Sequence, residues 1–382
     1  MSSKGLAKAR DIYANRAGRV RELKAEGKKI MGYVCAYPPL EMVTAMDYAP
    51  IRVIGSMDEP ITRADTQVPS IICPMLRSML DLGMKGKADF VEDFIGAHTC
   101  DCTEKFCHLY QYNMQFPYYH FLDVPHIAHK ASFGFMKAGF QLFQKTLEAH
   151  TGKKLDPDRL KEEVKKHNAQ RALVRELYGF RTQDPPLLSG SENLQIMLAL
   201  LSIPIEEGSG MLKDIIAEIK ARKDGPRNKA ARLLLWGSPL TETSIIDMIE
   251  SLNANVVMDD ICTGTRHFWH DVEMTSDPLD GLAKRYLDDL KCPRTFRETT
   301  SSFEEDQEVR FGYIKDYAKE WNVNGVILQS MKYCDTHGYE VPAIKAYFDR
   351  LGIPPLYLEH EYTMVALAPL KTRVEAFIEM IS

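Results

Sequence analysis

The sequence predicts an α/β protein with two Rossmann- or flavodoxin-like parallel-sheet domains and a helical section between them. The chain has 382 residues, which is more than a single hydrophobic core usually serves. Short apolar runs alternate with helical patterns near both ends, and this alternation is typical of βαβ units. The part in between has only long helical patterns. We therefore expect an N-terminal α/β domain at residues 1–130, a helical section at 131–225 and a C-terminal α/β domain at 226–382.

The N-terminal domain begins with a polar helix rich in Lys and Arg, which we expect at residues 6–26. Apolar runs of strand length follow, and helical patterns separate them. The expected strands are "KIMGYVCA", "IRVIGS", "ADFVEDFIGAHTC" and "YYHFLDVP". The expected helices are "PLEMVTAMDYA", "PMLRSMLDLGMKG" and "CTEKFCHLYQYN". Strands separated by helices predict a parallel sheet.

The helical section is predicted from two long stretches, "SFGFMKAGFQLFQKTLEAHTG" and "LDPDRLKEEVKKHNAQRALVRELYGF". In the second stretch, Asp156 or Asp158 suits the N-cap and Pro157 suits the first helical turn. The charged segment "ARKDGPRNK" contains Gly225 and Pro226, which indicate a linker to the C-terminal domain.

The C-terminal domain repeats the alternation. The expected strands are "ARLLLWGS", "NVVMDDIC", "NGVILQSMKYC" and "IPPLYLEHEY". The expected helices are "TETSIIDMIESLN", residues 279–290 and 309–321, "GYEVPAIKAYFDRLG" and "LKTRVEAFIEMIS". The two α/β halves are therefore similar in their predicted organisation.

Composition narrows the classes of partner. Apolar residues make up 45% of the chain, which is typical of a globular protein. The net charge is −5, so there is no excess of basic residues to bind nucleic acid or an anionic membrane. The N-terminus lacks the apolar segment of a secretory signal, and no run reaches the ~18 apolar residues of a membrane helix. We expect a cytoplasmic protein with no nucleic-acid or membrane partner.

The eight cysteines are the most informative residues. Cytoplasmic proteins rarely form disulfides, and a single buried cysteine is usually a small core residue. Five of the eight, however, lie at the carboxyl end of an expected strand or one loop beyond it, where open parallel sheets bind ligands. This shared position indicates a common site formed by Cys35, Cys73, Cys100, Cys262 and Cys334.

The densest group of thiols lies in "GAHTCDCTEKFCHLY". The C-x₂-C spacing that zinc sites and thioredoxin-type dithiols use is absent, because the spacings are C-x-C and C-x₄-C. A cysteine nucleophile paired with His98 or His108 is an alternative, although closeness in sequence does not fix a catalytic geometry. An iron–sulfur cluster also takes thiolates, and here they would come from separate loops.

Five segments in order resemble the catalytic subunits of 2-hydroxyacyl-CoA dehydratases and ATP-dependent (class I) benzoyl-CoA reductases, and the likeness is closer to a benzoyl-CoA reductase subunit. The resemblance covers most of the chain. The segments are "YPPLEMVTAM", "PSIICPMLRSMLDLGMKG", "HTCDCTEKFCHLY", "GSPLTETSIIDMIESLNANVVMDDICTGTR" and the block that begins "NGVILQSMKYCDTHGYEVPAIKAYFDRLG".

The resemblance implies a [4Fe–4S] cluster held by three cysteines from three segments. Carried over by position, these are Cys73, Cys100 and Cys334, so the cluster would lie between the two α/β domains. Relatives in this superfamily can carry larger, sulfur-linked assemblies. Cys35, Cys102 and Cys262 are thiols beyond the three expected ligands, so such a larger assembly is also possible in this chain.

Two cysteines receive no role. Cys107 lies on the apolar side of its expected helix, beside Phe106 and Tyr110, and is expected in the core. Cys292 precedes Pro293 in an expected loop.

The resemblance also implies partners and an activity. Members pair with a related second catalytic subunit and receive electrons from an ATP-hydrolysing iron–sulfur activator, which a low-potential donor such as ferredoxin supplies. Our chain has no G-x-x-x-x-G-K-[ST] motif, so we expect ATP to be used by the partner subunits and not by this chain. The favoured function is an iron–sulfur subunit that reduces, and so dearomatises, an aromatic acyl-CoA thioester by radical chemistry.

Three alternatives stay open. The chain could be a dehydratase subunit that eliminates water from a 2-hydroxyacyl-CoA through a ketyl radical. It could be an electron-relay iron–sulfur subunit whose partner holds the substrate. It could also be an α/β binding protein without a cluster, and an iron analysis would separate this alternative from the others.

Five further residues are candidates for the site. Glu41 begins a helix and is a candidate acid near the substrate, and His98 and His108 are candidate proton donors. Arg77 and Arg266 are candidates for holding the anionic parts of CoA. Each of the five also has an ordinary structural interpretation, as a helix-end charge, a hydrogen-bonded imidazole or a solvated guanidinium.

Overall fold

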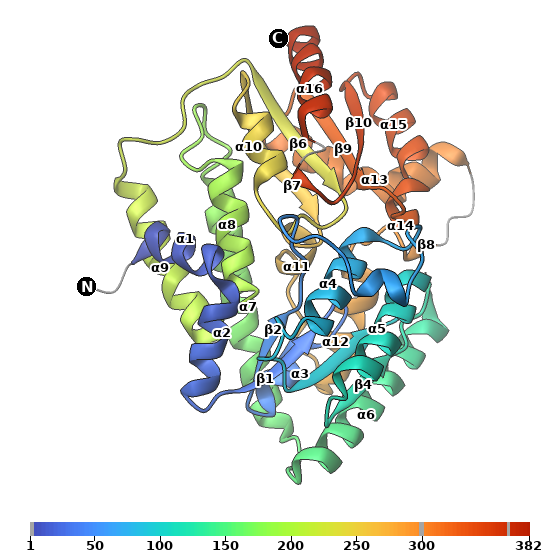
Figure 1. Ribbon diagram of the computed structural model, residues 1–382. Helices are drawn as coiled ribbons and strands as arrows, with labels where there is room; N and C mark the ends of the chain where they lie inside the picture. Colours follow the sequence, from blue (N-terminus) through green and yellow to red (C-terminus); the bar gives the residue numbers. More distant parts are fainter. Residues whose placement is uncertain (1–3, 298–301, 365–366) are drawn as a thin grey trace.

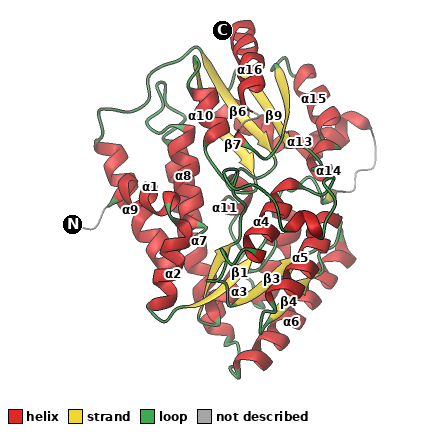
Figure 2. Cartoon of the chain, viewed as in Figure 1, coloured by secondary structure: helices red, strands yellow, loops and turns green. Residues whose placement is uncertain are grey.

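The computed structural model describes residues 4–297, 302–364 and 367–382. Two four-stranded sheets form its centre, and the strands in each run parallel (Figures 1 and 2). The N-terminal sheet has the order β2-β1-β3-β4, with β1 (Lys29–Tyr33), β2 (Tyr48–Arg52), β3 (Asp93–Ala97) and β4 (Tyr119–Leu122). The C-terminal sheet has the order β10-β9-β6-β7, with β6 (Ala231–Gly237), β7 (Ala254–Ile261), β9 (Gly325–Met331) and β10 (Pro355–His360). Counted from the first strand of each half, both orders are 2-1-3-4, and the predicted α/β class with two parallel sheets is confirmed.

Helices surround both sheets (Figure 2). Those of the N-terminal half are α3 (Leu40–Ala45), α4 (Pro74–Met84), α5 (Asp101–Met114) and the short 3₁₀ turn η1 (Ala64–Thr66). Those between the sheets in sequence are α6 (Lys130–Thr151), α7 (Pro157–Gly179), α8 (Gly190–Leu200) and α9 (Ile205–Ala221). Those of the C-terminal half are α10 (Ser244–Glu250), α11 (Thr265–Phe268), α12 (Pro278–Lys284), α13 (Phe303–Glu320), α14 (Asp335–Gly338), α15 (Val341–Arg350) and α16 (Leu367–Ile381). As predicted, the Asp156 side chain caps α7, where it accepts a hydrogen bond from the Asp158 N–H.

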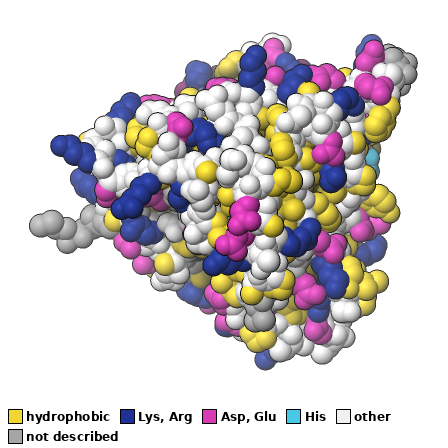
Figure 3. Space-filling model, turned by 90° about the horizontal axis from the view of Figure 1, so that it is seen from above, with side chains coloured by type: hydrophobic (Ala, Val, Ile, Leu, Met, Phe, Trp, Pro, Cys, Tyr) yellow, Lys and Arg dark blue, Asp and Glu magenta, His cyan; other side chains and the backbone are white. Residues whose placement is uncertain are grey.

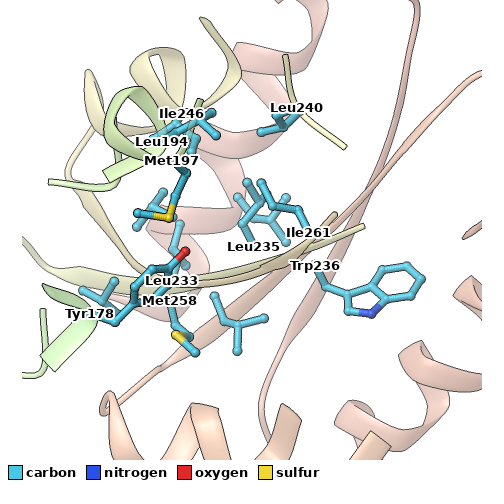
Figure 4. Packing of buried hydrophobic residues seen from close by; sticks show 14 of the residues in the cluster. Tyr178, Leu194, Met197, Leu233, Leu235, Trp236, Leu240, Ile246, Met258 and Ile261 are labelled. Carbon is cyan, nitrogen blue, oxygen red and sulfur yellow. The ribbon is translucent and has the colours of Figure 1, made fainter. Parts of the chain in front are cut away.

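The strands read as continuous apolar runs because helices cover both faces of the sheets. Every residue of β6 and β7 is buried. Figure 4 shows part of the resulting core, in which side chains of α8, α10, β6 and β7 form one cluster. This packing explains why alternation of strands and helices was readable from hydrophobicity alone.

The N-terminal helix differs from the prediction. The expected single helix is two helices, α1 (Gly5–Ala14) and α2 (Arg16–Ala25), which meet at Asn15. The Asn15 side chain accepts a hydrogen bond from the Gly18 N–H and so caps α2. The predicted helix at 279–290 is also divided, because α12 gives way to a π-helical turn, η2 (Arg285–Asp289).

Several segments tie the two halves together. The short strands β5 (Ile127–Ala128) and β8 (Phe296–Arg297) pair in parallel. Val272, Leu279 and Tyr286 pack into the apolar core of the N-terminal sheet, although they follow the C-terminal strands β6 and β7 in sequence. The boundaries at residues 130 and 225 stay a prediction.

On the face seen from above, Lys and Arg side chains are interspersed with Asp and Glu and with apolar side chains (Figure 3). Among the described residues, no helix is both long enough and apolar enough to cross a membrane.

Candidate metal centre

A cavity of about 510 Å³ lies where loops from the two halves meet. Residues that follow β1, β2 and β3 line one part of it, and residues that follow β6, β7 and β9 line another. Seven thiols line it, namely Cys35, Cys73, Cys100, Cys102, Cys262, Cys292 and Cys334. All eight cysteines of the chain are free. The five strand-end cysteines are thus brought together, and Cys107 is buried in the core instead, as expected.

The three expected cluster ligands stand at helix starts. Cys73 is the N-cap of α4, Cys100 is the N-cap of α5, and Cys334 directly precedes α14. These helices lie near one another in Figure 1. The Thr103 N–H donates to the Cys100 Sγ at 3.4 Å. The N–H groups and dipoles at the starts of α4 and α5 favour negative charge on the two sulfurs there.

Burial and neighbouring groups shift the pKa of most of these thiols. Burial raises the pKa of Cys73 to about 11 and that of Cys334 well above its usual value. Cys100 and Cys102 share a hydrogen bond, which raises the pKa of Cys100 and lowers that of Cys102 to about 7. Forming several thiolates together therefore needs positive charge in the cavity, which metal ions supply.

Three of the thiols form a second group. Burial and then the neighbouring Cys262 raise the pKa of Cys35, and burial together with Cys262 and Cys35 raises that of Cys292 to about 12. Cys35 has φ 68°, a left-handed conformation that non-glycine residues adopt mainly where the surroundings impose it, often at functional sites.

The donor set fits an iron–sulfur group. Thiolates select soft metals, so zinc and iron–sulfur clusters are the natural occupants. A structural zinc ion takes four ligands, whereas seven thiols share this cavity. The three helix-start cysteines would suffice to hold a [4Fe–4S] cluster, and four thiols remain.

Comparison with known proteins identifies the family of the chain. The sequence model of a family described as "2-hydroxyglutaryl-CoA dehydratase, D-component" matches residues 35–381. The chain belongs to this family.

Relatives of the chain are named as subunits of dehydratases and of a reductase. The chain is 27% identical over 372 residues to YjiM of Escherichia coli (strain K12), which is named as a dehydratase subunit; the match covers 95% of this chain and 94% of YjiM. It is 23% identical over 378 residues to the beta subunit of the lactoyl-CoA dehydratase of Anaerotignum propionicum, covering 98% of each chain. It is also 23% identical over 358 residues to a benzoyl-CoA reductase subunit of Thauera aromatica, covering 93% of this chain and 91% of that one.

Glu41 does not line the thiol cavity. Its carboxylate is fully buried at the start of α3, forms an ion pair with Arg171 and accepts a hydrogen bond from Tyr286 Oη at 2.8 Å. Burial alone would raise the pKa of Glu41, but Arg171, His167 and Arg285 together hold it well below the usual range. The structure gives Glu41 the surroundings of a structural ion pair.

The two candidate histidines of α5 and its preceding loop also lie outside the cavity lining. His98 Nδ1 lies 3.0 Å from Asp123 Oδ1, and His98, Asp101 and Glu104 bring possible ligand atoms within 4.8 Å of one another. His108 packs its ring against Phe121, with 5.0 Å between the ring centroids.

The two candidate arginines have different surroundings. Arg77 pairs with Asp65 in a separate cleft that acidic side chains also line. Arg266 is buried, and its guanidinium donates to Asp260 and to the Gly237 carbonyl. The Gly237 backbone has φ 147°, and an added Cβ would meet the Gln329 carbonyl oxygen at 1.8 Å, so this close turn requires glycine.

Several residues that line the cavity received no role from the sequence, among them Cys292, Arg52, Arg294 and His337. Cys292 has no signal beyond its thiol, since it is not at a strand end. Arg52 and Arg294 are 6% and 9% exposed, and their guanidinium groups donate to backbone carbonyls, Arg52 to that of Cys262. His337, close to Cys334, was readable only as part of the family-like C-terminal block.

Proposed function

We propose that this chain is the iron–sulfur subunit of a benzoyl-CoA reductase-type enzyme, which uses low-potential electrons for the radical reduction of an aromatic acyl-CoA thioester. The observation that supports the proposal is the gathering of seven thiols in one cavity. Membership of the family adds the CoA-thioester chemistry. A bound iron–sulfur group would supply one-electron reduction at low potential.

Cys73, Cys100 and Cys334 would hold a [4Fe–4S] cluster. Cys35, Cys102, Cys262 and Cys292 are further donors in the same cavity, and they favour a larger, sulfur-linked assembly over a single cubane. The residues of this chain would exclude water from the group and surround it with the buried guanidinium groups of the cavity wall.

The number of donors favours a reductase over a dehydratase. Adding two hydrogens across a ring double bond consumes two electrons and two protons, whereas eliminating water consumes no net electrons. A cavity with seven thiols can hold more iron, and so more electrons, than the single cubane that a redox-neutral elimination requires. The alternative is a subunit of a 2-hydroxyacyl-CoA dehydratase, which the names of two of these relatives favour.

The partners follow from the same proposal. The names of the relatives describe each of them as one subunit of an enzyme, which implies assembly with other subunits. For this chain we propose a related second catalytic subunit, an ATP-hydrolysing iron–sulfur activator and a low-potential donor such as ferredoxin, acting in the cytoplasm, where thiols stay reduced.

Anaerobic iron and sulfide analysis tests the metal centre. We expect wild-type protein to contain iron and acid-labile sulfide, and Cys73→Ala, Cys100→Ala and Cys334→Ala to lose the cluster. Cys107→Ala, which removes a core thiol outside the cavity, is the matched control and should keep its iron. Wild-type protein without iron would end the proposal, and iron above four atoms per chain would support the larger assembly.

Turnover assays test the reaction class. Benzoyl-CoA and a 2-hydroxyacyl-CoA are each supplied with partner subunit, activator, ATP and reductant. Reduction of benzoyl-CoA is the expected result. Turnover of the 2-hydroxyacyl-CoA alone would replace the reductase proposal by the dehydratase alternative, and substrate binding by the isolated partner alone would indicate an electron-relay subunit.

A further inference from the structure

A buried series of hydrogen bonds ends on the sulfur of Cys334. The Asp260 carboxylate accepts from Arg266 Nε at 3.1 Å and from Arg266 Nη2 at 2.9 Å. Arg266 Nη1 lies 2.7 Å from His337 Nε2, and His337 Nδ1 lies 3.2 Å from Cys334 Sγ. Asp260, Arg266 and His337 are each at most 3% exposed. The series joins β7 to the loop after β9, across the C-terminal sheet.

The arginine fixes which nitrogen of His337 carries the proton. A guanidinium has only donors, so His337 Nε2 must accept from Arg266. The neutral ring then has its hydrogen on Nδ1, and Nδ1–H donates to Cys334 Sγ. The ring cannot reverse these roles without placing two donors 2.7 Å apart.

The series is complete except at its sulfur end. Asp260 also accepts from Tyr313 Oη at 2.9 Å, and Arg266 donates to the Gly237 carbonyl at 3.0 Å. Burying charged groups is costly unless each donor and acceptor has a good partner. A neutral thiol is a weak acceptor, whereas a thiolate is a strong one. The Nδ1–H group of His337 therefore has a strong acceptor only when Cys334 is a thiolate, which is the form in which a cysteine binds a metal.

We propose that His337 is a positioning residue that donates a hydrogen bond to the Cys334 thiolate and so raises the reduction potential of the iron–sulfur group held there; this rests on the proposed function. Reduction adds one electron from the low-potential donor and one negative charge to the group, with no bond broken and no proton moved. A donor at the sulfur stabilises the more negative form. Arg266 acts on Cys334 through His337, also donates directly to Cys262 Sγ at 3.6 Å, and is not a contact for CoA.

The test compares variants that differ in the donor. His337→Asn keeps an N–H close to the Nδ1 position, and His337→Leu removes it. His360→Leu is the matched control, because His360 is also a buried imidazole but is bonded to Gln329 at 2.8 Å. Each protein is purified anaerobically and analysed for iron and sulfide. Its reduction potential is then measured by electron paramagnetic resonance during titration with titanium(III) citrate.

In His337→Leu we expect the reduction potential to be lower by about 59 mV, which for one electron is a tenfold change. At the same solution potential, the ratio of reduced to oxidised iron–sulfur group should then be about tenfold smaller than in wild type. His337→Asn and His360→Leu should stay near wild type. Iron lost from His337→Leu but kept in His337→Asn supports the same role for the donor. An unchanged or raised potential in His337→Leu, or iron lost from both His337 variants, overturns the inference. An iron-free wild type would instead refute the proposed function itself.

Discussion

Replacing Glu41 by Gln decides whether this buried carboxylate serves the fold or the chemistry. Glu41 is the partner of Arg171 in a fully buried ion pair. Arg285 lies in the same region, where burial and the neighbouring Arg171 lower its pKa. Among the described residues, neither guanidinium forms an ion pair with another carboxylate. Removing the charge of Glu41 therefore leaves two buried cations without a close anion.

The magnitude follows from the cost of an unpaired buried charge. Removing one partner of a buried ion pair destabilises a protein by about 3–5 kcal/mol. Gln can still accept the hydrogen bond from Tyr286, so we expect the lower end, about 3 kcal/mol. With roughly 2–4 °C per kcal/mol for a chain of a few hundred residues, the melting temperature should fall by about 6–12 °C.

Denaturant unfolding, iron content and turnover should be measured together on Glu41→Gln. The matched control is Glu162→Gln, which removes an exposed carboxylate 2.7 Å from Lys165 and should change the unfolding free energy by no more than about 0.5 kcal/mol. A loss below about 1 kcal/mol in Glu41→Gln, combined with lost turnover at normal iron content, would refute the structural role and restore Glu41 as a candidate acid.

Two further predictions concern buried charges. Arg52→Gln and Arg294→Gln should lower the reduction potential of the bound group, because each removes a buried positive charge from the cavity wall. Arg52→Lys and Arg294→Lys keep the charge and should stay near wild type. Redox titration checks this prediction, and equal potentials in the Gln and Lys variants would contradict it. Burial, opposed by Glu41, lowers the pKa of His167 to about 4, so the stability present above pH 6.5 should fall as the pH drops from 6.5 to 4. The loss is about 3 kcal/mol at about 1.36 kcal/mol per pKa unit. Denaturant unfolding at pH 7 and pH 5 should show the fall and a weaker one in His167→Gln; identical pH slopes would argue against it.

The sheets were predictable because parallel strands covered by helices are apolar along their whole length. That signal is local in sequence, and it located seven of the eight strands of the two sheets, whereas the expected strand at 51–56 overlaps β2 only at the last two residues of β2. The break between α1 and α2 was not predictable in the same way, because it depends on a single cap. Asn15 makes one side-chain hydrogen bond to the Gly18 N–H, and nothing in the apolar pattern on either side marks it.

The candidate site was predictable only in part. A general rule about parallel sheets pointed to Cys35, Cys73, Cys100, Cys262 and Cys334. Cys292 does not follow a strand of either sheet, and it reaches the cavity because the segment before it packs against the core of the opposite half. Such a position depends on how the two halves fit together, which no local pattern records.

Arg77 and Arg266 show why a residue type can be predicted while its role cannot. Both are arginines in family-like segments, and as sequence they are equal candidates for holding an anion. Arg77 lies in a cleft with Asp65 and other carboxylates, which disfavours the phosphates of CoA. Arg266 is buried, and its role depends on His337, 71 residues away in sequence. Because its donors go to Asp260, a carbonyl, His337 and the Cys262 sulfur, its positive charge acts on the thiol cavity, not on a ligand in solvent.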